Sequence, residues 1–482
     1  MFSSRSLPLL ASVAAIPLSG MAAVQEPIGL NPENPHYFEW RGQPTILITS
    51  GEHYGALMNL DFDFHRYFAT LATDGLNLTR TFSGAYVEPQ GAFRIERNTL
   101  APSRDRFICP WARSDKAGYP NGGNKFDLDR WDDAYFNRLH ALMSAASARG
   151  VVVEFTLFCP MYGDEQWRLS PMNPANNTSG LPALSRTNVY TLDRHGGLLP
   201  YQEALTRRVV TELHDYDNLI YEICNEPYFG GVTLEWQHHI ADVITATERD
   251  LGVRHLISRN VANGSAKVGT PHPAVSVFNF HYASPPDAVQ LNYGLERVIG
   301  DNETGFRGTA DLPYRLEAWN FILAGGGLFN HLDYSFVVGH EEGTYDYPQT
   351  QPGGGNPELR RQFRTLKRFI ESFDFIRMHP DNAVIRSGVP EGCTGRALVE
   401  PGKAVALYLS RNASLKPKAD APATGPVSTT LELSLPDGRY QADWINPVTG
   451  AVDRQENVTA RDGVLRLESP PFRDDVALGL RK

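Results

Sequence analysis

Short hydrophobic runs alternate with stretches of helical periodicity from about residue 45 to residue 375. We expect eight strands, at 44–49, 76–82, 151–158, 219–225, 255–260, 275–280, 297–302 and 327–335. Apolar positions recur at helical spacing in 61–73, 131–149, 203–215, 234–251, 312–324 and 359–373. Strands that alternate with helices indicate a parallel sheet. Eight such units predict an α/β fold, a closed (β/α)₈ TIM barrel.

The pattern changes after residue 373. Segments 404–409, 429–435, 438–444, 463–467 and 475–480 alternate apolar and polar residues, with turn signals such as Pro436-Asp437-Gly438 between them. This predicts a small C-terminal antiparallel β-sandwich. We therefore expect a barrel domain over 23–375 and a sandwich domain over 376–482. The sandwich either supports the barrel or binds carbohydrate.

Length and charge narrow the class of protein. A chain of 482 residues is too long for one ordinary core but fits a barrel and a small second domain. A net charge of −10 argues against a nucleic-acid partner, which requires clustered Lys and Arg. The oligomeric state is left open.

The first 22 residues have the pattern of a secretory signal peptide. Arg5 precedes an apolar stretch at 7–18, and small residues follow at 20–22. No later run reaches the roughly 18 apolar residues that span a bilayer. We expect cleavage of this segment and export to a periplasm or the medium, with no membrane partner. An uncleaved N-terminal anchor is the alternative.

The motif Asn225-Glu226-Pro227 closes the predicted buried strand 219–225. Barrel enzymes place their active-site groups at the C-terminal ends of the strands. Glu226 is therefore a candidate general acid/base, and Asn225 beside it could bond a sugar hydroxyl. The alternative is a surface glutamate at a helix start.

A second carboxylate, Glu303, follows the predicted strand 297–302, with Glu296 and Asp301 as competitors. Period two places Asp301 and Glu303 on the same side of a strand. Two carboxylates in one barrel mouth can cleave a glycosidic bond: one stays protonated as the acid, and the other stays ionised as the nucleophile. Neighbouring charge and burial separate their pKa values.

Other polar or aromatic residues lie at strand ends or in the long loops 83–130, 159–201 and 337–357. Arg80 could pair with a carboxylate, and Tyr282 could donate to the nucleophile. The further candidates for substrate binding are Glu52, His53, Trp111, His281 and Asp333. Each has a structural alternative, such as a surface charge, a core aromatic or loop packing. No spacing matches a metal motif, so we expect neither a metal nor a cofactor.

Residues 37–340 resemble the glycoside hydrolases of clan A, and their layout is similar to the cellulase-like family 5. The resemblance is carried by Asn225-Glu226-Pro227, by Glu303 after a strand, by Arg80 on strand two and by His281-Tyr282 on strand six. It implies a (β/α)₈ retaining enzyme with Glu226 as acid/base and Glu303 as nucleophile. It also implies that Asn225 lies near the substrate 2-hydroxyl and Tyr282 near the nucleophile.

Two further segments, 37–44 and 444–450, resemble apiosidase-like glycosidases, which carry such a β-sandwich. The chain also departs from the family 5 pattern twice. His281 and Tyr282 are adjacent, where the family has one residue between them. No tryptophan occurs in 328–334, where the family has one on strand eight.

We therefore expect an exported retaining β-glycosidase whose partner is a polysaccharide or a derived oligosaccharide, with exo-action favoured by the long loops. The rival hypothesis is a non-catalytic carbohydrate-binding or adhesion protein on a barrel scaffold. An esterase is disfavoured because the chain has no Gly-x-Ser-x-Gly motif.

Overall fold

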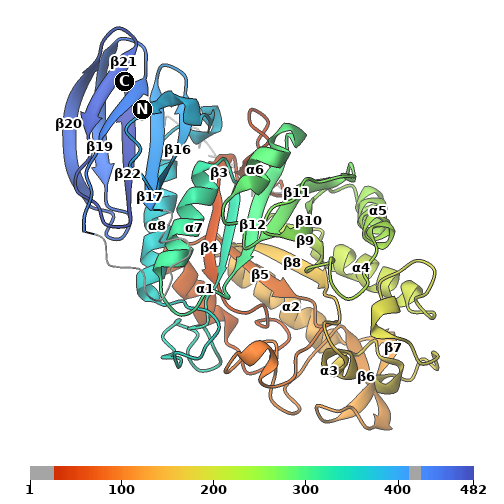
Figure 1. Cartoon of the computed structure of the whole chain (residues 1–482). Helices are drawn as coiled ribbons and strands as arrows, with labels where there is room; N and C mark the ends of the chain where they lie inside the picture. The colour runs from red at the N-terminus through yellow and green to blue at the C-terminus, as the bar shows by residue number, and fades with distance from the viewer. Residues whose placement is uncertain (1–25, 412–424) are drawn as a thin grey trace, which may run out of the picture.

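Eight parallel strands surround the centre of the larger part of the molecule (Figure 1). The structure is a computed structural model that describes residues 26–411 and 425–482. The strands are β4 (Leu47–Gly51), β5 (Leu78–Phe82), β8 (Val152–Phe158), β9 (Leu219–Cys224), β10 (Leu256–Asn263), β11 (Val275–His281), β12 (Val298–Thr304) and β13 (Leu328–Leu332). They pair in the order β4-β13-β12-β11-β10-β9-β8-β5, which confirms the predicted barrel.

The seam between β4 and β5 has no continuous ladder, and the Asn77 side chain bridges it beside two backbone hydrogen bonds, from Asn77 N–H to the Ile48 carbonyl (3.4 Å) and from Phe82 N–H to the Tyr54 carbonyl (3.0 Å). Asn77 accepts from the Ile48 backbone N–H through Oδ1 (3.0 Å). Its Nδ2 donates to the Ile46 carbonyl oxygen (2.9 Å). One amide side chain therefore provides both a donor and an acceptor across the gap, and it closes the barrel at this end.

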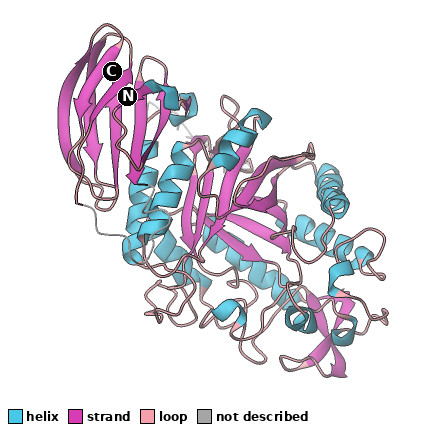
Figure 2. Cartoon of the chain, in the orientation of Figure 1, coloured by secondary structure: helices cyan, strands magenta, loops and turns pink. Residues whose placement is uncertain are grey.

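Helices cover the outside of the barrel (Figure 2). They are α1 (Phe64–Thr73), α2 (Asp133–Ser147), α4 (Leu199–Leu213), α5 (Leu234–Leu251), α7 (Leu312–Leu323) and α8 (Pro357–Glu371), together with the short α3 (Asp164–Leu169) and α6 (Asp287–Asn292). The six predicted helices are therefore confirmed, although α4 begins four residues before its predicted start. The loop 83–130 is not wholly irregular, because it contains a hairpin of β6 (Trp111–Ala117) and β7 (Asn124–Trp131).

The barrel interior changes from apolar to polar along the strands. One residue from every strand joins an apolar layer at the N-terminal ends: Leu47, Leu78, Val152, Ile220, Leu256, Val277, Val298 and Leu328. A small sheet of β1 (Gly29–Leu30), β2 (Phe38–Trp40) and β3 (Gln43–Thr45) covers this layer. Two residues further along, inward positions carry Arg80, Glu154, Glu222, Ser258 and Asn279.

Two antiparallel sheets follow the barrel, as predicted. One contains β14 (His379–Pro380), β16 (Cys393–Glu400), β17 (Ala404–Arg411), β19 (Gly438–Ile445), β20 (Val452–Ala460) and β22 (Asp475–Arg481). The other contains β15 (Ile385–Ser387), β18 (Thr430–Ser434) and β21 (Val464–Glu468). Alternate residues of β17 point to opposite faces: Leu407 joins the core between the sheets, whereas Tyr408 joins the core of the barrel.

The larger sheet packs against α7 of the barrel. Tyr408 stacks on Trp319 with ring centroids 5.1 Å apart. Arg315 pairs with Asp475 at 2.9 Å, and both side chains are buried. This contact combines aromatic packing with a buried ion pair and fixes the sheet against the barrel.

The signal peptide and the domain limits stay sequence-based predictions. Residues 1–22 lie outside the described residues, and the boundary between 375 and 376 follows from the sequence pattern alone. None of the helices in the described ranges has the length and apolar character that a membrane span requires.

The seam gives the first testable prediction. Asn77→Ala removes two hydrogen bonds between β4 and β5, and we expect it to lower the free energy of unfolding by about 1–3 kcal/mol. Chemical denaturation measures this loss. Asn457→Ala, an exposed change on the edge strand β20, is the control and should cost about 0.5 kcal/mol or less. Equal losses in the two variants would contradict the role of Asn77.

Candidate active site

A pocket of about 400 Å³ lies at the carboxyl ends of the barrel strands. Its lining comprises His53, Tyr54, Phe82, Tyr86, Glu88, Phe93, Leu100, Cys159, Tyr162, Asn225, Glu226, Phe229, Asn263, Tyr282, Glu303 and Phe306. Five of the sequence-predicted site residues therefore share one cavity: His53, Asn225, Glu226, Tyr282 and Glu303. A sixth, His281, is buried against both glutamates.

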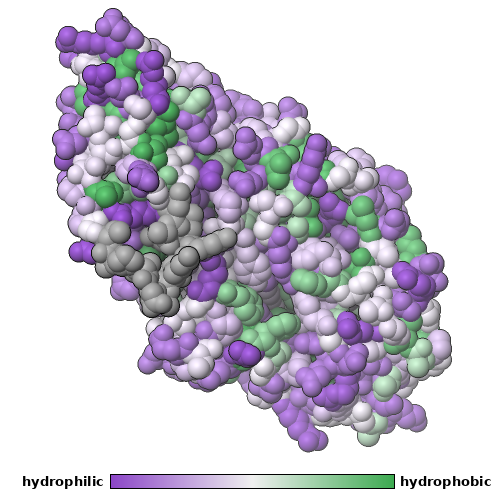
Figure 3. Space-filling model, in the orientation of Figure 1, coloured by the Kyte–Doolittle hydropathy of each residue, from purple (hydrophilic) through white to green (hydrophobic). Residues whose placement is uncertain are grey.

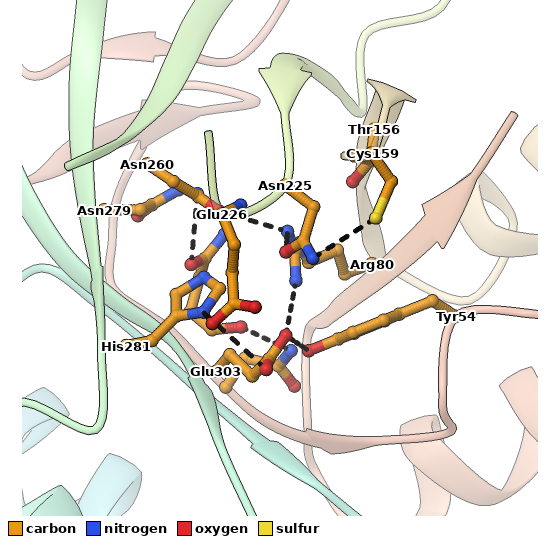
Figure 4. A network of polar contacts seen from close by, with 12 residues as sticks. Tyr54, Arg80, Thr156, Cys159, Asn225, Glu226, Asn260, Asn279, His281 and Glu303 are labelled. Carbon is orange, nitrogen blue, oxygen red and sulfur yellow. Dashed lines mark hydrogen bonds and ion pairs between the residues drawn. The ribbon is translucent and has the colours of Figure 1, made fainter. Parts of the chain in front are cut away.

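Glu226 and Glu303 converge at the base of this pocket. They lie on different strand ends, far apart in the sequence, yet one carboxylate oxygen of each and a ring nitrogen of His281 all lie within 4.8 Å of one another. Figure 4 shows the two carboxylates pointing toward each other with the His281 ring beside them. The fold therefore brings the two candidate carboxylates into one site.

Both residues of the His281-Tyr282 pair face the site, although they are adjacent in the sequence. The ladder between β11 and β12 has an irregularity between Phe280 and His281. Tyr282 then adopts a left-handed backbone with φ of 54°. These two departures from regular strand geometry turn neighbouring side chains to the same side.

A similar irregularity overturns the expectation for Asp301. The β12–β13 register shifts between Asp301 and Thr304, so Asp301 and Glu303 do not share a face. Asp301 accepts from the Ala283 backbone N–H (3.2 Å), and burial followed by the charge of Glu317 raises its pKa well above the usual value. Of these two carboxylates, only Glu303 lines the pocket.

Three side chains hold the Glu303 carboxylate. Tyr282 Oη donates to Oε1 (2.7 Å), Tyr54 Oη donates to Oε2 (3.0 Å), and Arg80 Nη1 donates to Oε2 (3.1 Å). The Arg80 guanidinium also lies over the Tyr54 ring, 4.5 Å from its centroid. A carboxylate with a cation and two hydroxyl donors is stabilised in its charged form.

Glu226 has a different set of partners. Tyr162 Oη donates to Oε2, Tyr228 Oη lies 3.3 Å from Oε1, and His281 Nδ1 lies 3.2 Å from Oε1. Burial acts to raise the pKa of Glu226, but the bonds from His281 and Tyr162 outweigh it and hold that pKa below its usual value. The backbone of Glu226 is left-handed, with φ of 35°, and its N–H donates to Asn260 Oδ1 (2.9 Å).

His281 lies between the two carboxylates, and the negative charge of each favours its protonated ring. Burial disfavours its protonated ring, yet Glu303 and Glu226 together raise the pKa of His281 above 6.5. The two neighbouring carboxylates therefore favour the protonated form of the imidazole, against the opposing effect of burial.

A buried polar network supports the site from below. Arg80 Nε donates to Glu222 Oε2 (3.0 Å), its Nη2 pairs with the other oxygen of Glu222, and Nη2 also donates to Asn225 Oδ1 (2.6 Å). Asn302 Nδ2 donates to both Glu222 (2.6 Å) and Glu154 (3.0 Å). The ends of β9 and β12, which carry the two glutamates of the pocket, are thus tied to the barrel interior.

Three predicted substrate-binding residues lie elsewhere, which corrects the expectation for each. Glu52 is buried and accepts from the backbone N–H groups of Gly55 and Ala56 and from the Thr99 hydroxyl, so it holds a loop. Asp333 pairs with Arg360 at 2.7 Å beneath α8. Trp111 is fully buried at the start of the β6–β7 hairpin. None of the three lines the pocket.

The pocket also contains residues that no sequence pattern indicated, chiefly Tyr54, Tyr162, Phe93, Phe229 and Phe306. Tyr54 directly follows His53 at the first strand end, so its position offered a weak signal. The others occupy loops without periodicity, where no local pattern indicates direction. His53 does line the pocket, and neither of its ring nitrogens makes a hydrogen bond within the described structure.

Glu226, His281 and Glu303 have the donor types and the spacing of a metal-ligand group. The surroundings favour a different use. Arg80 places a fixed positive charge 3.1 Å from Glu303 and opposes a nearby cation, and the tyrosine hydroxyls already occupy carboxylate lone pairs. The arrangement fits proton and charge chemistry better than metal binding.

Solved structures of glycoside hydrolases share this fold. A candidate glycoside hydrolase from Bacteroides vulgatus ATCC 8482 matches with a TM-score of 0.64 at 12% identity, over 96% of this chain and 83% of that one. A family 5 glycoside hydrolase from the same organism matches with a TM-score of 0.61 at 12% identity, over 95% and 93%. Another protein, described as a glycoside hydrolase, matches with a TM-score of 0.63 at 13% identity, over 95% of this chain and 97% of that one.

Because the matches span nearly the whole chain, the shared fold includes the C-terminal sheets as well as the barrel. The resemblance to clan A and family 5 enzymes is confirmed at the level of the fold. No protein-family model and no curated protein matches the sequence. The likeness of 37–44 and 444–450 to apiosidase-like enzymes stays a prediction.

The network below the site predicts a pH-dependent stability. Burial, and then the charge of Glu222, raises the pKa of Glu154 to about 7. The unfolded chain ionises this group near pH 4.3. Between these values the folded state binds more protons, so the contribution of Glu154 to the free energy of unfolding falls as pH rises.

Glutamine does not titrate. Between pH 4.5 and pH 7.5 the free energy of unfolding of Glu154→Gln should therefore fall by up to about 3 kcal/mol less than that of the wild type. Urea unfolding at both pH values measures it. Glu165→Gln, an exposed carboxyl on α3, is the control and should keep the wild-type dependence. Identical pH dependence in wild type and Glu154→Gln would refute the buried, proton-retaining state.

Proposed function

We propose that this chain is a retaining β-glycosidase that uses Glu226 as acid/base and Glu303 as nucleophile. The observation that carries the proposal is the approach of the two carboxylates, whose oxygens lie within 4.8 Å at the base of one pocket. Carboxyl groups about 5–5.5 Å apart are typical of retaining enzymes, whereas inverting enzymes leave a gap of about 6.5–9.5 Å for water. The barrel fold shared with glycoside hydrolases supports the same reaction class.

The environments of the two glutamates favour different roles. The Glu303 carboxylate is held in place by the Arg80 guanidinium and by the hydroxyls of Tyr54 and Tyr282, which suits a nucleophile. It attacks the anomeric carbon and forms a glycosyl-enzyme ester, while the aglycone oxygen takes a proton from Glu226. Water then attacks the same carbon, with Glu226 now accepting the proton, and releases Glu303.

His281 supplies the proton that Glu226 needs in the first step. In the free pocket the imidazole competes for this proton better than the carboxylate does, because two carboxylates raise the pKa of His281 while the pKa of Glu226 is lowered. When substrate excludes water from the pocket, burial of Glu226 deepens and favours its neutral form. Transfer over the 3.2 Å contact from Nδ1 to Oε1 then protonates the acid. His281 acts through Glu226 and is a positioning and proton-holding residue.

We also propose export and a carbohydrate substrate. The signal-like pattern of residues 1–22 supports export. The pocket's concentration of hydroxyl, amide and carboxylate groups supports recognition of a sugar ring.

Substitution of the two glutamates tests the assignment. Glu226→Gln and Glu303→Gln should each reduce kcat/KM by at least about 10²–10⁴-fold on a panel of β-glycosides of different monosaccharides. NMR of the first-formed sugar should show retained β configuration. Glu52→Gln, which removes a buried carboxylate outside the pocket, controls for loss of folding when paired with circular dichroism. Inverted product would eliminate the nucleophile role, and binding of glycosides without any turnover would favour the carbohydrate-binding alternative.

The role of His281 predicts a change in pH profile. Wild-type kcat/KM should decline on the alkaline side only above pH 6.5, where the raised pKa of His281 lies. In His281→Gln the proton must sit on Glu226, a carboxyl with an ordinary pKa near 4.3. The alkaline limb should therefore move to lower pH, with a loss of at least about tenfold in kcat/KM at pH 7. An unchanged alkaline limb would show that His281 does not hold the catalytic proton.

A further inference from the structure

Three solvent-exposed phenylalanines surround the mouth of the candidate active site. Phe93, Phe229 and Phe306 are 41%, 43% and 41% exposed, and they are the phenylalanines in the described ranges that reach this exposure. All three line the same pocket. Single exposed apolar residues are ordinary on a protein surface, but a group around a cavity marks a binding site. We call this group the aromatic collar.

The visible face of the molecule is mainly hydrophilic, with small separate groups of hydrophobic residues (Figure 3). Against this background the other large hydrophobic residues with similar exposure do not line the pocket. They are Leu192, Leu251, Leu291, Val448 and Val452. The gathering of exposed rings at the pocket is therefore specific to that site.

The collar is assembled from three separate loops. Phe93 follows β5, Phe229 follows β9, and Phe306 follows β12. The Phe93 and Phe306 ring centroids are 6.5 Å apart, so these two rings meet across the mouth. Tyr162 connects Phe93 with Phe229, because its ring centroid lies 5.4 Å from that of Phe93 and 5.8 Å from that of Phe229. Three phenylalanine rings and the Tyr162 ring thus form one continuous aromatic border above the glutamates.

The backbone is left-handed at or next to two of these rings. Phe93 itself is left-handed, with φ of 55°, a conformation that non-glycine residues rarely adopt. The Phe229 loop continues into Gly230 and Gly231, both left-handed. A Cβ at Gly231 would lie 2.3 Å from the Thr187 carbonyl oxygen, so glycine lets this loop press against its neighbour. Such backbone is typical of binding sites, and packing alone gives no reason to hold Phe93 in water.

Polarity changes with depth in the pocket. The buried lining holds the polar groups Glu226, Glu303, Asn225 and His53 beside apolar residues such as Phe82 and Leu100. The exposed lining consists of the collar phenylalanines and one polar residue, Asn263, whose Oδ1 already accepts from Tyr228. Phenylalanine offers no N–H or O–H, so three of the four exposed lining residues can bury an apolar group but cannot bond the hydroxyls of a second sugar.

We propose that the collar binds the leaving group of the substrate, and that this leaving group is an apolar ring or alkyl chain. This inference rests on the proposed glycosidase function and narrows it from polysaccharides to glycosides with apolar aglycones. The sugar occupies the polar floor, and its glycosidic oxygen lies between Glu226 and the collar. A pocket of about 400 Å³ is near the lower end of the range for ligand sites, roughly 300–1,000 Å³, and suits a small glycoside.

Two glycosides of the same sugar test the proposal. Benzyl and 2-hydroxyethyl glycosides release alcohols of similar acidity, so their kcat/KM ratio reports the aglycone site. Wild type should favour the benzyl glycoside by at least about tenfold, since a ring buried among rings gains both area burial and aromatic contact. Phe229→Ser and Phe306→Ser should each lower this ratio about fivefold or more.

Leu291→Ser is the matched control, because Leu291 is 49% exposed on α6 and does not line the pocket. It should leave the ratio unchanged. A wild-type ratio near one, or equal loss on both glycosides in the phenylalanine variants, would overturn the proposal.

Calorimetric titration of the full-length Glu303→Gln variant separates this inference from the proposed function. Tighter binding of the benzyl glycoside, with no turnover by wild type, would support the collar and refute the hydrolase. Turnover by wild type with equal binding of both glycosides would support the hydrolase and refute the collar.

Discussion

The buried guanidinium of Arg80 is the interaction on which the rest of the site depends. It contacts Glu222 from β9 and Glu303 from β12, bonds Asn225 beside the proposed acid, and lies over the Tyr54 ring after β4. A buried carboxylate without a partner is strongly unfavourable, and a pair that loses one member leaves an uncompensated charge. One side chain from β5 therefore permits two acidic residues inside the barrel and fixes the positions of three strand ends.

The polar interior is possible because the barrel separates its layers. Apolar residues from all eight strands close the N-terminal end under a small sheet, so the polar groups are sealed from below by apolar packing. Above them Glu154 is bonded by Ser258 and Asn279 at 2.7 Å each, and its pKa is raised to about 7. Burial and the neighbouring Glu222 thus disfavour a negative charge on Glu154, while Arg80 bonds Glu222 and Glu303.

Chemistry is concentrated where the regular strand geometry ends. Tyr54, Glu226 and Tyr282 have left-handed backbones with φ of 60°, 35° and 54°. The β11 and β12 ladders shift register just before the pocket. In a regular strand every second side chain would point away from the pocket, to the outer face of the barrel. These irregularities let consecutive residues face one site, which explains how the chain accommodates an adjacent His281-Tyr282 pair.

The sequence by itself determined the barrel, the C-terminal sheets and the positions of Glu226 and Glu303 at strand ends, because burial and periodicity are local properties. Only the tertiary structure decided which neighbours reach the pocket. Three predicted residues lie outside it: Trp111 is buried in the core, Glu52 accepts from loop N–H groups, and Asp333 pairs with Arg360. The collar phenylalanines instead surround its mouth. Loop direction and register shifts depend on contacts between distant segments, such as Gly231 against Thr187, and these leave no periodic signal in the chain.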